Sequence, residues 1–172
     1  MTSTPKCSSE MAQKVGYEFR MFAFLFAQLR YSASESDVLL PGEMVELGTS
    51  QLAPDERLGV FAQLESFLLH ARVLRDFFFR KPKFDDDVVA EHFLPDWSAH
   101  RASLGPYLTA HELRLNKALA HLTTMRLDYD KAEKKWEVST IRDELQPVID
   151  SFLSKLPRDR QRWFDYTTEE PN

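Results

Sequence analysis

The feature that most constrains this fold is a set of long segments whose apolar residues recur three and four positions apart. This spacing puts them on one side of an α-helix, which has about 3.6 residues per turn. The first segment, residues 10–31, is apolar over about half of its circumference. A helix of this kind has to be covered by neighbouring helices or by a second subunit. Its predicted buried stripe is Val15, Phe19, Phe22, Ala23, Phe26 and Leu29.

Three further segments carry the same period. The second helix is predicted to begin at Pro54, a favoured first-turn residue, and to end near Arg80, before Pro82. A third helix is predicted over residues 105–125, opened by Gly105 and Pro106. The last is predicted over residues 140–156, with Thr140 to Asp143 as a variant capping box and a proline inside it.

The segments between these helices are less regular. Residues 32–53 are predicted to connect the first two helices, and residues 83–104 to contain a short helix ending near His92. Trp97 is expected to fill a gap between longer helices. Residues 126–138 alternate apolar and polar residues around a charged centre, which favours a small hairpin or an ordered loop.

Together these segments predict an all-α protein, an antiparallel four-helix bundle with short extra helices and a small hairpin before the last helix. Residues 10–164 are expected to form one domain, with a flexible leader (1–9) and a flexible tail (165–172). The chain has 172 residues, enough for one substantial core, and its 13 phenylalanines predict a core of large rings.

Composition and charge exclude several classes of protein. With 5 glycines and no Gly-rich phosphate loop, the common nucleotide-binding motifs are absent. The single cysteine, Cys7, excludes a disulfide framework and suits a reducing compartment. The longest apolar run, residues 21–27, is too short to cross a bilayer, and the first residues lack a secretion signal. The expectation is therefore a cytoplasmic protein with no membrane segment.

The polar residues that look arranged for chemistry lie on the third predicted helix. Arg114, Lys117 and His121 form a line beside its apolar stripe. Arg114 and His121 are seven residues apart, so they project in directions about 20° from each other and lie about 10 Å apart along the axis. Such a pair is either a solvated edge of the helix or half of an active site.

The run from Leu115 through Asn116 and Lys117 to His121, with a charged segment and an amphipathic last helix after it, resembles the HEPN families. These are all-α domains, many of them RNases of toxin or antiviral systems and others non-catalytic modules. Their mark is an arginine, a spacer of four to six residues and a histidine. Arg114 and His121 have the six-residue spacer. In the form that aligns most naturally, arginine directly precedes the asparagine, whereas here Leu115 holds that position and Arg114 lies one residue earlier.

The resemblance implies metal-independent RNA cleavage, in which a 2′-hydroxyl attacks the neighbouring phosphate. His121 would transfer protons near neutral pH, Arg114 would stabilise charge on the phosphate oxygens, and Asn116 would support them. No cofactor is implied. A homodimer is implied, because in these families the sites of two subunits face each other, and an antitoxin or nucleotidyltransferase is an expected partner. The alternative is a non-catalytic bundle that binds RNA, a nucleotide or a protein.

Two basic clusters are candidate nucleic-acid contacts, together with Lys117. Arg72 and Arg75 belong to a cluster at the end of the second helix, and Arg158 and Arg160 to one after the last helix, near aromatic residues. The simpler interpretation is that cations favour helix C-termini in general. Because the net charge is −5, any RNA has to meet such a local patch.

The remaining polar residues support no metal site. His92, Asp96 and His100 lie close in sequence, but a proline separates them and no metal-binding helical spacing is present. His70 lies on a mostly apolar helix and is expected at the edge of the core.

Overall fold

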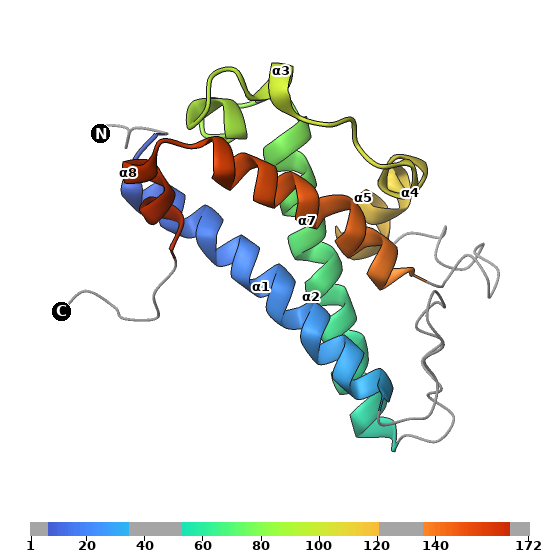
Figure 1. Ribbon diagram of the computed structural model, residues 1–172. Coiled ribbons are helices and arrows are strands. Elements are labelled where there is room, and N and C mark those ends of the chain that lie inside the picture. The colour runs from blue at the N-terminus through green and yellow to red at the C-terminus, as the bar shows by residue number, and fades with distance from the viewer. Residues whose placement is uncertain (1–6, 35–52, 121–135, 166–172) are drawn as a thin grey trace.

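A computed structural model describes residues 7–34, 53–120 and 136–165. These residues are mostly helical and include no strand, which confirms the all-α class for the described part. The two longest helices are α1 (Ser9–Ser34) and α2 (Pro54–Phe79), close to the predicted bounds. They run in opposite directions and form the most extensive pair among the described helices (Figure 1).

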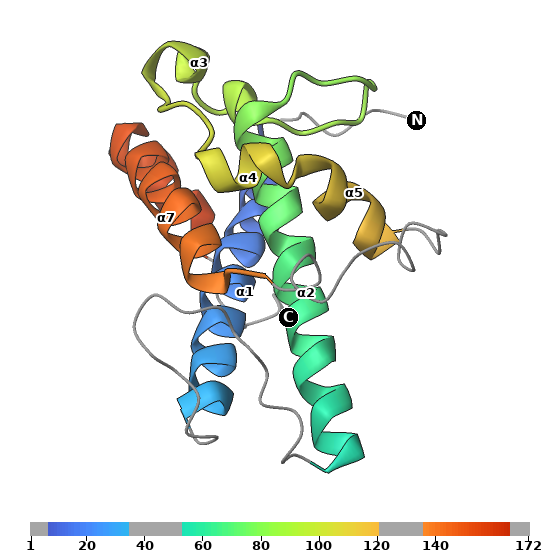
Figure 2. The ribbon, with the colours of Figure 1, turned by 90° about the vertical axis from the view of Figure 1, so that its right-hand side faces the viewer.

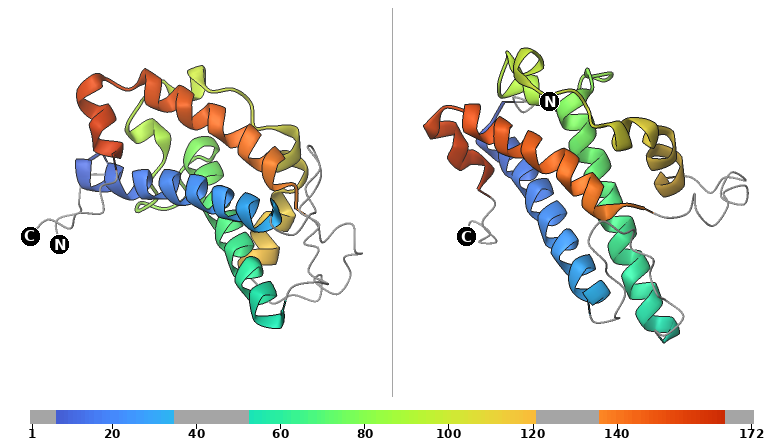
Figure 3. Two further views of the ribbon diagram at one scale, coloured as in Figure 1. Left: turned by 60° about the horizontal axis from the view of Figure 1, so that its bottom comes forward. Right: turned by 45° about the vertical axis from the view of Figure 1, so that its right-hand side comes forward.

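A third long helix, α7 (Val138–Lys155), lies beside α1 with the opposite direction and also contacts α2 (Figures 1 and 3). After Pro157 the chain continues as α8 (Arg158–Gln161) and η2 (Arg162–Phe164), which returns to α1. Gly16 lies at this contact, and a Cβ there would overlap the carbonyl group of Phe164. The glycine therefore allows η2 to approach the α1 backbone.

The prediction of one continuous helix over residues 105–125 is wrong. The described part of it forms two helices, α4 (Pro106–Ala110) and α5 (Glu112–Ala120), which point in different directions (Figure 2). The break is at His111, whose backbone leaves the helical region while its ring stacks on Tyr107 at 4.1 Å. The ring nitrogen Nδ1 also lies 2.9 Å from the Tyr107 carbonyl oxygen. These contacts of the side chain favour the turn over a straight helix.

Helix α4 is held by a side chain from α7. The Glu144 carboxylate accepts hydrogen bonds from the backbone N–H groups of Tyr107 and Leu108, at 2.8 and 2.9 Å. It thus supplies acceptors for backbone N–H groups of the first turn, which have no acceptor within the helix. Gly105 makes this approach possible, since a Cβ there would overlap the Glu144 side chain.

Helix α7 begins two residues before the predicted start, and the predicted capping box is wrong. Its N-cap is Glu137, with no side-chain cap, and the Thr140 hydroxyl donates to the Glu137 carboxylate at 2.8 Å. Pro147 lies inside the helix, as expected. The predicted hairpin at residues 126–138 lies mostly outside the described residues.

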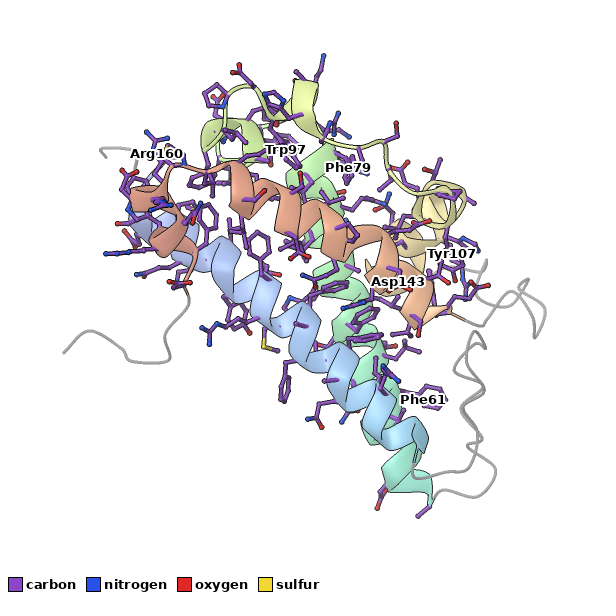
Figure 4. The ribbon with its side chains drawn as sticks, viewed as in Figure 1. Phe61, Phe79, Trp97, Tyr107, Asp143 and Arg160 are labelled. Carbon is purple, nitrogen blue, oxygen red and sulfur yellow. The ribbon has the colours of Figure 1, made fainter. Side chains whose placement is uncertain are left out.

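The short elements close one end of the molecule. They are η1 (Ala90–His92) and α3 (Trp97–His100), above the C-terminal end of α2. Trp97 is fully buried, as predicted, and its indole N–H donates to the Phe78 carbonyl oxygen at 3.0 Å. Figure 4 shows it between this end of α2 and α7. On α1 the predicted stripe is wrong at Ala23, which is exposed.

Aromatic rings form the centre of the core. Phe152 of α7 packs edge to face against four rings from α2, α3 and η2, with centroid separations of 5.3 to 5.6 Å. This geometry is favourable for the ring quadrupoles. The cluster contains Phe77, Phe78, Phe93, Trp97, Phe152 and Phe164.

Candidate functional site

Arg114, the candidate catalytic arginine, lies on α5 and is half-buried. Its guanidinium carbon lies 3.8 Å from the ring centroid of Trp136, the buried residue shortly before α7. This cation–π contact orients the guanidinium and connects α5 with the start of α7.

Asn116 is held by a buried arginine of α2. Its side-chain oxygen accepts a hydrogen bond from Arg75 Nη2 at 2.9 Å. The Arg75 side chain is only 2% exposed, and its Nε and Nη2 also donate to Asp76 at 2.9 and 2.6 Å. Between the two candidate residues, Leu115 is fully buried, so it belongs to the core. Asn116 therefore has a structural contact whatever its chemical role.

The other half of the candidate pair lies outside the described residues. The structure describes neither His121 nor the side chain of Lys117. The spacing of Arg114 and His121 as an active site stays a prediction.

The structure divides the basic cluster at the end of α2 between two faces. Arg72 lies on one face, in a cavity of about 610 Å³ between α1, α2 and the segment after α2. We call this cavity the basic groove. Its cations are Lys14, Arg72, Arg80, Lys81 and Lys83. Arg75 faces the other side, inside the protein, so the structure does not place it as an exposed phosphate contact.

The acids of the basic groove are already engaged. Glu18 lies 2.6 Å from His70, Asp76 accepts from two arginines, and Asp87 accepts the backbone N–H groups of Lys83 and Phe84. Four of the five cations have no acidic partner among the described residues; only Arg80 is paired, with Asp76 and Glu112. The groove thus combines an unneutralised positive charge with an exposed aromatic ring, Phe84, whose exposure is 69%.

Lys14 and Phe84 were missed as functional candidates by sequence reasoning. Lys14 comes from α1 and Phe84 from the segment after α2, so only the packing of these elements unites them with Arg72. No local pattern could have found this grouping.

The second basic cluster is less uniform. Arg158 is exposed on α8. Arg160 makes internal contacts, donating from Nη1 to the Phe93 carbonyl oxygen at 3.2 Å and lying over the Trp163 ring at 5.6 Å. Figure 4 shows Arg160 at the α8 end of the molecule. It ties α8 to η1, which is a structural role.

His70 and His92 each make a polar contact within the protein. His70 is buried at the edge of the core, as predicted, and pairs with Glu18. His92 Nδ1 lies 3.2 Å from the Val89 backbone nitrogen. Across residues 7–34, 53–120 and 136–165, no group of three or more His, Cys, Asp or Glu side chains is arranged to hold a metal ion.

The chain matches no protein-family model, no curated protein and no solved structure in the comparisons made with each. Among the described helices, none is both long enough and apolar enough to cross a membrane.

Proposed function

We propose that this protein is a HEPN-like helical protein that binds single-stranded RNA in the basic groove. The observation that carries the proposal is a set of four cations that have no acidic partner within the part of the chain that the structure describes, Lys14, Arg72, Lys81 and Lys83, beside the exposed ring of Phe84. Unpaired cations along a groove attract a phosphate backbone, and an exposed aromatic ring offers a surface on which a base stacks.

The fold part of the proposal is an antiparallel four-helix bundle formed by α1, α2, α5 and α7. It is supported by the opposite directions of α1 and α2 and of α1 and α7, and by the contact of α5 with α2. The proposal includes a homodimer in the cytoplasm, with an antitoxin or nucleotidyltransferase as partner, as the resemblance implies.

The test is fluorescence anisotropy with a labelled single-stranded RNA at several salt concentrations. Charge reversal at two exposed groove residues, Lys81→Glu with Lys83→Glu, is expected to weaken binding at least about tenfold and to make its salt dependence less steep. The matched control reverses two arginines outside the groove, Arg158→Glu with Arg162→Glu, which changes the net charge equally. If the control weakens binding and the groove variant does not, the RNA lies on α8 and the groove assignment is wrong.

A second candidate function is metal-independent RNA cleavage by Arg114 and His121, with Asn116 in support. The observation in its favour is that Arg114 and Asn116 are both held by neighbours, Trp136 and Arg75, and that such support orients catalytic side chains. The assay is RNA cleavage in EDTA by the wild type, Arg114→Ala and His121→Ala. Cleavage lost in both variants, with both still folded and of unchanged mass by light scattering, supports the pair; cleavage retained in both rejects it.

Asn116→Ala is not a clean test of catalysis. Because Asn116 accepts from buried Arg75, its removal leaves a buried donor unpaired and is expected to cost about 1–3 kcal/mol of stability. Urea unfolding of this variant separates the structural loss from any loss of cleavage. An unchanged urea midpoint would show that Arg75 finds another acceptor. Any loss of cleavage in this variant could then be assigned to a chemical role of Asn116.

A further inference from the structure

A second cavity, which we call the arginine cavity, lies on the other face of α2. Its volume is about 470 Å³, and it is formed by the C-terminal half of α2, the segment 98–104 and the start of α5. Phe79, near its wall, is labelled at this end of α2 in Figure 4. The polar and charged side chains that line it are Arg75, Arg80, Ser98, Arg101, Ser103 and Glu112.

The main feature of the arginine cavity is an unused donor on Arg75. The Nη1 atom of this buried side chain has no hydrogen-bond partner among the described residues. Its ion pair with Glu112 Oε1 is 3.9 Å long, beyond hydrogen-bond distance. A buried guanidinium N–H without an acceptor is unfavourable, so its presence beside a cavity indicates an acceptor that enters from outside.

Two further guanidinium groups line the same cavity. Arg101 donates from Nη1 to the Phe78 carbonyl oxygen at 2.9 Å and lies over the Phe79 ring at 5.0 Å, which fixes its position. Arg80 is shared with the basic groove and is bound by Asp76 and Glu112. The three arginines meet two acids, Glu112 in the lining and Asp76 beside it, so the group keeps one excess positive charge and the cavity favours an anion.

We propose that the arginine cavity binds a phosphate group, either inorganic phosphate or the phosphate of a small monoester. Guanidinium groups recognise such oxyanions through paired N–H donors, and the hydroxyls of Ser98 and Ser103 add donors for the remaining oxygens. The volume lies in the range of small-molecule sites, about 300–1,000 Å³. A small phosphate fits better than a nucleic-acid backbone, because Arg75 lies deep inside the protein. Arg80 lines both cavities, but the anion contacts proposed here come from Arg75 and Arg101, which line only the arginine cavity.

The test is calorimetric titration of the full chain with inorganic phosphate and, separately, with glycerol 3-phosphate, against chloride at equal ionic strength. Ser103 is exposed and makes no hydrogen bond in the described structure, so Ser103→Asp adds a negative charge to the cavity without removing a contact. It is expected to weaken phosphate binding at least about tenfold through charge repulsion. Ser139→Asp, an equal change at an exposed residue that does not line the cavity, is the matched control and is expected to bind like the wild type.

The outcomes separate the possibilities. Tighter binding of glycerol 3-phosphate than of phosphate assigns the site to a monoester, and the reverse assigns it to inorganic phosphate. The groove variant Lys81→Glu with Lys83→Glu is expected to retain phosphate binding. If this variant no longer binds phosphate, the anion binds in the basic groove. The proposal is overturned by that loss, by no binding of either anion, or by Ser103→Asp binding as tightly as the Ser139→Asp control.

Discussion

At the scale of single residues, two glycines of the long helices, Gly16 and Gly59, lie in opposite environments. Gly16 and Gly59 both lie inside long helices, where glycine is usually destabilising relative to alanine. A Cβ on Gly16 would overlap the Phe164 carbonyl group, whereas a Cβ on Gly59 would meet nothing within 4 Å. The same substitution therefore has opposite expected effects at the two sites.

Gly16→Ala is expected to destabilise the fold by about 1–3 kcal/mol, because η2 has to move away from α1 to make room. Gly59→Ala is expected to stabilise it by about 0.5–1 kcal/mol through the better helix propensity of alanine. Urea unfolding of both variants measures the difference. Equal stability of the two would contradict the close approach of η2 to α1.

At the scale of elements, the junction of α4 with α7 contains a tyrosine whose pKa is shifted, Tyr107. The Tyr107 hydroxyl accepts the Glu137 backbone N–H at 2.9 Å, and burial raises the pKa of Tyr107 above its ordinary value. The folded state therefore favours the neutral phenol more than the unfolded state does. The hydrogen bond from Glu137 acts in the opposite direction but is the smaller effect.

It follows that the contribution of Tyr107 to stability is complete below the pKa of an unfolded tyrosine, about 10, and is lost as the pH rises further through the raised pKa. Tyr107→Phe removes this titration. The free energy of unfolding of this variant is therefore expected to fall less than that of the wild type between about pH 9 and about pH 11, on either side of the ordinary tyrosine pKa. Chemical unfolding at several pH values measures both slopes. Parallel curves would show that the Tyr107 pKa is the same in both states.

At the scale of the whole molecule, one aromatic cluster joins elements that are far apart in the sequence. Phe152 of α7 contacts rings of α2, α3 and η2, so its removal affects each of these contacts. Phe84, by contrast, is 69% exposed at the basic groove. Substitution of Phe152 is therefore expected to affect the stability of the fold, and substitution of Phe84 to affect RNA binding.

Phe152→Ala is expected to cost about 3–5 kcal/mol of stability, since it opens a cavity in a packed core. Phe84→Ala is expected to change stability by less than about 0.5 kcal/mol, as most exposed positions do, and to weaken RNA binding by about 1–3 kcal/mol if a base stacks there. Thermal unfolding and RNA anisotropy on both variants provide the comparison. A stability loss in Phe84→Ala would place that ring in the core.

The sequence by itself determined the all-α class and the bounds of α1, α2 and α7 within a few residues, because apolar periodicity and prolines act locally along the chain. It also determined that Trp97 is buried. Only the tertiary structure decided that the chain turns at His111, because the Glu144 carboxylate that binds the start of α4 and the Trp136 ring beside His111 come from distant parts of the chain. Only the tertiary structure united Lys14 with Arg72, and Arg75 with Arg101, because charges distant in sequence become neighbours only when the helices pack.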